Sequence, residues 1–297
     1  MAPFFTFGGL FYWQDRYAYA DWKIQENIWS KRCRILDAYN VCRYLGTYAE
    51  CRERLNLFVK NWELTVPSSQ AVVILPGIYR GKRKFTRMID EFKSANFEVI
   101  FVSMPMLRYS VKEKAEALDK LLSERPDLTT IHFIAAGTGG LVLRQAAALP
   151  SVWHDKIGRS MLISVPNNGL SWATKKRTKR WYRLLFGNMG ESLLPSKAKK
   201  IPLMTGEFAT MSGGKGDGSR GFIPFFKGDD DGLLTPKDMK HPNAKADFLI
   251  TGGIHFTLTR DKRAIEICKQ FIIFGYSNKK RGRKDSKLMN FLIDNDD

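Results

Sequence analysis

Hydrophobic and polar positions in the middle of the chain alternate between two periods. Continuous runs of aliphatic and β-branched residues predict buried strands at AVVILPG (71–77), EVIFVSMP (98–105) and SMLISVP (160–166). Apolar residues at helical spacing predict amphipathic helices at KFTRMIDEFKSANF (84–97) and SVKEKAEALDKLLSERP (110–126), the second capped by Ser110. Strands that alternate with helices at this spacing predict βαβ units. The expected fold class is therefore α/β, with a doubly wound, mostly parallel sheet.

Residues 1–66 follow a different pattern, and we interpret them as a small N-terminal β-rich extension. Three short strands are expected at WKIQENIW (22–29), CRILDA (33–38) and NVCRYLG (40–46). A helix is predicted after them, with Thr47 as its cap and Glu50 completing a capping box. The apolar and aromatic start, MAPFFTFGGLFYW, is interpreted as a packing arm.

A sharp strand-to-helix turn is predicted within IHFIAAGTGGLVLR (131–144). A short apolar strand is followed by six residues with very small side chains, and then by an apolar helix start. This pattern is typical of a nucleophile elbow, in which a strained turn exposes one side chain above the sheet. The frame here is A-A-G-T-G, so the exposed position is Gly137, which has no side chain.

The order of several separated motifs resembles bacterial α/β-hydrolases of the lipase and esterase type. The motifs are AVVILPG, VSMP, IHFIAAGTGGLVLR, SVPNNG, GDDDGLL and IHFTLTRD, and they cover roughly residues 68–275. The segments DWKIQENIW and CRILDAYNV also look like the front end of one bacterial branch of that family. The resemblance implies an α/β-hydrolase-like domain over residues 67–276.

The resemblance also implies roles for individual residues. Asp231 matches the acid of a catalytic triad and His255 matches its base, in the family's chain order of nucleophile, acid and histidine. Ile78 and Thr138 would supply the two backbone amides of the oxyanion hole. Gly77 occupies the turn before the first of these amides and is a candidate ligand-binding residue.

The departures from the family pattern are concentrated where the chemistry takes place. Gly137 stands where the family has its nucleophilic serine, and Ala136 and Pro76 stand where it has histidines. Loss of the nucleophile alone removes the route through an acyl-enzyme, because no side-chain oxygen remains at the elbow.

Each candidate residue also has an alternative interpretation. The three consecutive acids that end at Asp231 can form a solvated turn, an Asx turn or a cation site, and His255 can be structural. Thr138 lies one residue beyond the nucleophile position, and we expect its side chain to follow the helix.

Ser164, at a strand end where open α/β sheets bind ligands, is either a ligand-binding residue and replacement nucleophile or a hydrogen-bonded structural serine. The glycines at 137, 139 and 140 favour tight packing over a phosphate loop, because no nucleotide fingerprint is present.

Basic segments suggest contacts with anionic partners. The net charge is +18, and an insertion at about 168–215, interpreted as a lid, contains TKKRTKRWYRLLFG and SKAKK. A basic tail is expected over residues 277–297. Few aromatic residues lie among these charges, which argues against nucleic acid and leaves a solvated surface or an anionic membrane surface.

The remaining features predict neither a metal nor a cofactor. The four cysteines form no CxxC pair and no metal-ligand spacing with histidine, so reduced thiols are expected. No run of about 18 apolar residues occurs, and the start lacks a basic segment before its apolar residues, so a cytoplasmic protein is expected.

The sequence therefore predicts a lipase- or esterase-like protein that has lost serine-based hydrolysis. Such a pseudoenzyme would bind a small acyl or lipid-like ligand, or a partner, without turnover. One alternative is an active ester hydrolase that uses another nucleophile or a water activated by His255. A further alternative is a scaffold that binds an anionic membrane surface or nucleic acid through its basic segments.

Overall fold

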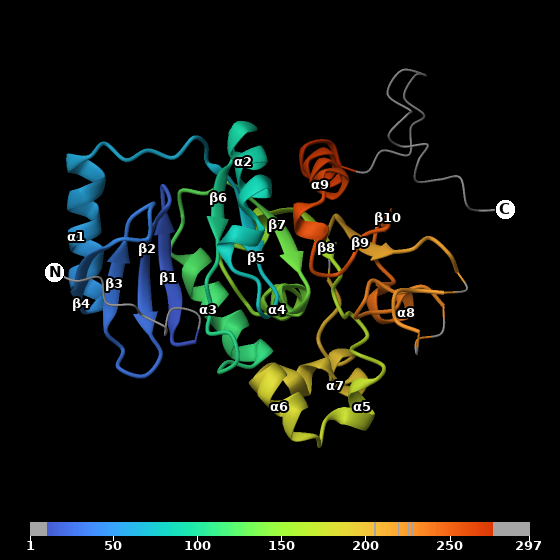
Figure 1. The fold of residues 1–297 in the computed structure, drawn as a ribbon. Coiled ribbons are helices and arrows are strands. Elements are labelled where there is room, and N and C mark those ends of the chain that lie inside the picture. Colours follow the sequence, from blue (N-terminus) through green and yellow to red (C-terminus); the bar gives the residue numbers. More distant parts are fainter. Residues whose placement is uncertain (1–10, 205, 219, 225, 227, 276–297) are drawn as a thin grey trace, which may run out of the picture.

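The computed structural model describes residues 11–204, 206–218, 220–224, 226 and 228–275, which form two sheets (Figure 1). The larger sheet has six strands, all parallel, in the order β10-β9-β8-β7-β5-β6. Its strands are β5 (Gln70–Leu75), β6 (Glu98–Phe101), β7 (Thr130–Ala136), β8 (Ile157–Ile163), β9 (Phe208–Gly214) and β10 (Asp247–Thr251). The predicted α/β class and doubly wound parallel sheet are confirmed.

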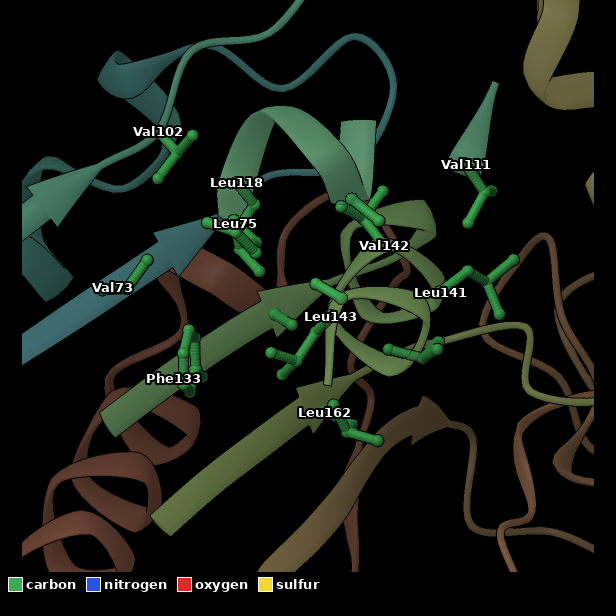
Figure 2. Close-up of a cluster of buried hydrophobic side chains, with 14 of the residues drawn as sticks. Val73, Leu75, Val102, Val111, Leu118, Phe133, Leu141, Val142, Leu143 and Leu162 are labelled. Carbon is green, nitrogen blue, oxygen red and sulfur yellow. The ribbon is translucent and has the colours of Figure 1, made fainter. Parts of the chain in front are cut away.

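Helices cover both faces of this sheet, and each face has its own hydrophobic core. One core lies beneath α3 (Val111–Ser123) and α4 (Thr138–Ala146), and the other beneath α2 (Thr86–Ser94) and α9 (Lys262–Phe274). Figure 2 shows the first core, to which Leu141, Val142 and Leu143 of α4 belong together with Phe133 of β7 and Leu162 of β8. The side chains of α4 thus fix the helix start that follows the elbow turn.

The N-terminal extension is an antiparallel sheet of four strands with one covering helix. The strands are β1 (Trp13–Tyr19), β2 (Trp22–Asn27), β3 (Cys33–Leu36) and β4 (Cys42–Gly46), and α1 spans Tyr48–Asn61. The three predicted strands are confirmed, and so is the capping box between Thr47 and Glu50. Strand β1 was not predicted, and its buried Asp15 pairs with Lys23 at 2.6 Å, a polar contact that hides the hydrophobic alternation. The proposed packing arm lies mostly outside the described residues.

A buried ion pair joins the extension to the edge of the large sheet. Arg125, after α3, donates to both carboxylate oxygens of Glu98 in β6, at 3.0 and 2.5 Å. The same guanidinium donates to the carbonyl oxygen of Ala18 in β1 at 2.6 Å. The amide of Asp15 also donates to the carbonyl oxygen of Ser103, just after β6. These contacts attach the extension along β6, with Glu98 at the amino end of the strand and Ser103 just beyond its carboxyl end.

The segment after β8 contains short helices, as expected for an insertion, but it ends earlier than predicted. Its helices are α5 (Ala173–Lys176), α6 (Arg180–Phe186) and α7 (Pro195–Ala198), with a 3-10 segment over Gly187–Leu193. The predicted end at residue 215 is wrong, because β9 (Phe208–Gly214) is an inner strand of the large sheet. The sequence FATMSGG has few β-branched residues and two glycines, so it carries a weak strand signal.

Short elements η1 (Lys82–Lys84), η2 (His154–Lys156), α8 (Pro236–Met239) and η4 (Leu258–Arg260) complete the described fold, and the predicted tail at 277–297 lies outside it.

Candidate functional site

The turn between β7 and α4 has the backbone shape of a strained elbow, with glycine at its tip. Gly137 has φ 53° and ψ −127°, a conformation that residues with a β-carbon adopt only at an energetic cost. A β-carbon built there would lie 3.7 Å from Cα of Gly77 and 3.8 Å from Nε2 of His255. These are ordinary contacts, so the position has room for a small side chain that would point at the histidine.

Asp231 and His255, which are 24 positions apart in the sequence, form a hydrogen-bonded pair opposite this turn. Nδ1 of His255 lies 2.9 Å from Oδ2 of Asp231, and both side chains are buried. The amide of His255 donates to the carbonyl oxygen of Asp231 at 2.6 Å, which fixes the two residues to each other through the backbone as well. The pair leaves Nε2 of His255 directed at Gly137, as in the geometry that the resemblance implies.

The other oxygen of Asp231 is held by the chain that follows it. Oδ1 accepts the amides of Leu233 at 3.1 Å and Leu234 at 2.8 Å. Its neighbours Asp229 and Asp230 are also buried and accept backbone amides of surrounding loops. The acidic triplet is therefore a buried turn, and the solvated turn considered from the sequence is wrong. Among the residues that the structure describes, no cluster of three or more His, Cys, Asp or Glu side chains is arranged to hold a metal.

Burial keeps His255 in its neutral form. It lowers the pKa of the imidazole, and this effect outweighs the hydrogen bond to Asp231, which favours the charged form. The positive charge of Arg80 lowers this pKa further. The guanidinium lies close to the imidazole, because its Nη2 donates to the carbonyl oxygen of His255 at 2.5 Å. A neutral imidazole can accept a proton at Nε2 while Asp231 stabilises the resulting cation, as a general base requires.

The predicted oxyanion-hole amide of Ile78 already has a partner. Its N–H donates to Oγ1 of Thr138 at 3.2 Å. The Thr138 side chain therefore turns back towards the loop after β5, which corrects our expectation that it would follow the helix. An amide that is occupied by a hydroxyl is not free to stabilise a negatively charged oxygen.

The glycines after the elbow are explained by packing. A β-carbon at Gly139 would lie 2.3 Å from the carbonyl oxygen of Leu75, and one at Gly140 would lie 2.3 Å from Cγ2 of Val165. Both approaches are far shorter than van der Waals contact, so the start of α4 can reach the sheet only if these residues lack side chains. The structure thus favours the packing interpretation of these glycines over the phosphate loop.

Ser164 does not join the site. It is fully buried with φ 47°, and its hydroxyl has no hydrogen-bond partner among the described residues. It does not line the cavity next to the elbow, and its burial favours a structural role over the predicted role in ligand binding. The sequence correctly predicts that Ser164 follows a core strand. Its burial could not be predicted, because it depends on which loops cover the end of that strand.

A cavity of about 200 Å³ lies beside the elbow, and three predicted residues line it, Gly77, Ile78 and Thr138. Sequence reasoning missed two other residues that contribute to its wall, Arg80 and Lys114. Both are charged side chains that the fold buries, at 5% and 7% exposure. Neither residue stands out in the sequence, because arginine and lysine are rarely buried without a partner.

Two further sequence-based expectations concern thiols and membranes. The four cysteines are free thiols, with Cys33, Cys51 and Cys268 buried and Cys42 exposed. In the described part of the chain, no helix has the length and hydrophobicity needed to cross a lipid bilayer.

Comparison with solved structures identifies lipases with a similar fold. Bacillus licheniformis lipase BlEst2 in its mature form aligns over 69% of this chain and 89% of its own, with 15% identity and a TM-score of 0.51. Its propeptide form aligns over 72% of this chain and 52% of its own, with 17% identity and a TM-score of 0.56. No family model matches the chain, and no curated protein sequence matches it either. The parallel sheet, the elbow turn and these structural neighbours together show that the chain has the α/β-hydrolase fold of lipases and esterases.

Proposed function

We propose that this protein is a lipase- or esterase-like pseudoenzyme that binds a small acyl or lipid-like ligand, or a partner, without hydrolysing it. The observation that carries the proposal is the glycine at the elbow tip, which faces a paired His255 and Asp231. A general base and its orienting acid are present, but Gly137 has no oxygen from which the base can remove a proton. The hydrogen bond between Ile78 and Thr138 supports the same conclusion, because it occupies one amide that ester hydrolysis would use.

The test restores the missing oxygen. Wild type and Gly137→Ser are compared for release of p-nitrophenol from short and long acyl esters, and Gly137→Ser/His255→Ala is measured beside them. We expect no turnover by wild type and measurable turnover by Gly137→Ser, because the new hydroxyl would lie next to Nε2 of His255. The activity should disappear in the double variant, in which no base remains. Gly137→Ala is the control, since it adds the same β-carbon without an oxygen.

The same experiment distinguishes the pseudoenzyme from the alternative, an active enzyme that hydrolyses esters with a water activated by His255. In that reaction, water would lose a proton to Nε2 of His255, its oxygen would attack the ester carbonyl, and the departing alkoxide would recover the proton. Wild-type turnover that is lost in His255→Ala would establish this route and overturn the pseudoenzyme proposal. An inactive Gly137→Ser that still folds would argue against the roles assigned to Asp231 and His255.

One surface feature favours binding to anionic membranes as a second function. Trp181, Leu184 and Leu185 of α6 are exposed, at 44%, 75% and 44%. Exposed basic residues lie near them in the sequence: Lys175, Lys176, Arg177, Lys179, Arg180 and Arg183. We call these six basic residues and the three apolar residues together the α6 patch. In Figure 1, α6 lies at the lower side of the molecule, away from α2 and α9. Apolar side chains among basic ones are typical of helices that lie in the headgroup region of a bilayer.

Vesicle sedimentation tests this second function. We expect the protein to bind vesicles that contain phosphatidylglycerol and to bind pure phosphatidylcholine weakly. Leu184→Asp should reduce the binding severalfold, because it places a negative charge within the α6 patch. Val152→Asp is a matched control, since Val152 is exposed to the same 75% but lies outside the patch. Equal binding by both variants would contradict the assignment of this surface.

A further inference from the structure

The cavity beside the elbow lies where the two parts of the fold meet. Its wall includes Leu75 and Phe101 at the carboxyl ends of β5 and β6, and Thr138 at the start of α4. Lys23 of the N-terminal sheet also contributes to the wall. Any ligand in this cavity therefore contacts the loop that carries the predicted oxyanion-hole amide.

Three of the cations that line the cavity have no ion-pair partner. Among the described residues, no carboxylate oxygen lies within 4.0 Å of the charged nitrogens of Arg80, Lys82 or Lys114. Lys23 differs, because Asp15 neutralises it at 2.6 Å. The cavity thus carries an excess of positive charge in a partly dehydrated space.

The individual contacts show that this charge is not satisfied within the fold. Nζ of Lys114 donates to the carbonyl oxygen of Met106 at 3.1 Å, its one printed hydrogen bond. Nη1 of Arg80 is buried and has no hydrogen-bond partner among the described residues. Burial lowers the pKa of Lys114 to about 8 and, against the attraction of the Asp231 carboxylate, lowers that of Arg80 to about 10, so both sites disfavour the charge that they hold. A bound anion would remove that penalty at both residues.

Much of the remaining wall is apolar, although Asn40, Ser103 and Thr138 also line the cavity, and the space is small. Val102, Met106 and Val142 line it together with Leu75 and Phe101. The volume of about 200 Å³ is below the roughly 300–1,000 Å³ of pockets that hold drug-sized ligands. This volume suits a molecule with a charged head and a short hydrocarbon part better than one with a long acyl chain.

We infer that the cavity binds a short amphiphilic anion, a carboxylate or phosphate head on a short acyl or alkyl chain, through Arg80, Lys82 and Lys114. The inference deepens the proposed function, and rests on it, by naming the ligand class of the same site. A neutral ester would leave three buried or half-buried cations without a partner, whereas an anion satisfies them. The head group lies next to the cations, and the chain lies against the aliphatic wall.

Calorimetric titration of the wild-type protein tests the inference with four probes: hexanoate, hexyl phosphate, inorganic phosphate and hexanol. We expect hexanoate or hexyl phosphate to bind at least tenfold more tightly than hexanol, because only the anions pair with the cations. Stronger binding of hexyl phosphate than hexanoate would identify a phosphate head, and the reverse order a carboxylate. Binding of inorganic phosphate as tight as that of both alkyl anions would overturn the amphiphilic ligand.

Two lysine variants locate the binding. Lys114→Met and Lys82→Met should each weaken the binding of the preferred anion by about tenfold, the loss expected for one charge-assisted hydrogen bond. Lys112→Met is the matched control, because Lys112 is exposed on the same helix as Lys114. Equal affinity for hexanol and the anions, or unchanged affinity in both cavity variants, would overturn the inference. Ester turnover by the wild type would overturn the pseudoenzyme proposal alone, so the two failures are distinguishable.

Discussion

His255 faces Gly137 so closely that a β-carbon on the glycine would lie 3.8 Å from Nε2 of the imidazole. The histidine is held on its other side by Asp231 at 2.9 Å. The structure therefore places a hydrogen-bonded Asp–His pair beside a strained turn whose tip has no side chain. This relationship makes the consequences of adding atoms at the elbow predictable.

The first prediction concerns the strain of the elbow. Gly137→Ala should lower the free energy of unfolding by about 1–3 kcal/mol, because φ is 53° and ψ is −127° at this position. Gly81→Ala is the control, since its φ is −78° and nothing lies within 4 Å of an added β-carbon. That variant should be neutral or more stable by up to about 1 kcal/mol. Urea unfolding measures both, and equal effects of the two substitutions would contradict a strained turn.

The second prediction concerns Thr138 in a protein with a restored nucleophile. In the Gly137→Ser background, Thr138→Ala should raise kcat at least tenfold, because it releases the amide of Ile78 from the hydroxyl that occupies it. One oxyanion-hole donor is worth about 100- to 1,000-fold in kcat elsewhere, so a tenfold effect is a modest expectation. Thr138→Ser keeps the hydroxyl and should leave the rate unchanged. A loss of activity in Thr138→Ala would instead assign the hydroxyl a supporting role.

The third prediction concerns the effect of the buried Lys114 on the free energy of unfolding. Lys114→Met should raise the free energy of unfolding by about 1–2 kcal/mol, because a cation that has one carbonyl partner and no ion pair is replaced by an apolar side chain of similar length. Lys112→Met, on the exposed face of α3, should change it by less than about 0.5 kcal/mol. Thermal unfolding at pH 7 compares them. Destabilisation by Lys114→Met would mean that the ammonium group supports the fold.

The fourth prediction concerns the dependence of stability on pH. Burial lowers the pKa of both His132 and His241 to about 4, and it also lowers the pKa of His255. The unfolded chain, with histidine pKa values near 6.5, therefore binds more protons between pH 6.5 and 4, so stability falls as the pH decreases through this range. For His132 and His241, a pKa lowered from 6.5 to about 4 corresponds to about 3 kcal/mol of lost stability each by pH 4. In urea titrations, His132→Gln should show a shallower decrease, and an unchanged slope would argue against a buried neutral His132.

The fifth prediction concerns the ion pair that attaches the N-terminal sheet. Arg125→Ala should lower the free energy of unfolding by about 3–5 kcal/mol, because Glu98 would stay buried without its partner. Arg263→Ala removes an exposed partner of Asp261 and should cost at most about 1 kcal/mol. Denaturant unfolding followed by tryptophan fluorescence measures both variants. Similar small losses would show that the extension is attached chiefly by its other contacts.

Much of the fold was predictable because its signals are local. Buried strands such as β5 and β7 read as continuous aliphatic runs, and capping boxes at Thr47 and Ser110 mark the starts of α1 and α3. Strand β1 was missed because a polar pair lies on its buried face. The predicted lid insertion is too long because β9 has only one β-branched residue, Thr210, so its position in the sheet depends on pairing with β8 and β10.

The sequence by itself determined the elbow, with its glycine, and the order in which the nucleophile position, Asp231 and His255 occur. These follow from residue type and from spacing along the chain, which need no folding to be read. Only the tertiary structure decided that Asp231 and His255 meet, that Thr138 occupies the amide of Ile78, and that Ser164 is buried out of reach. It also decided that Arg80 and Lys114 gather around one cavity. The physical reason is that a hydrogen bond, or the exclusion of water from a charge, depends on which loops pack together, and distances along the chain do not encode this.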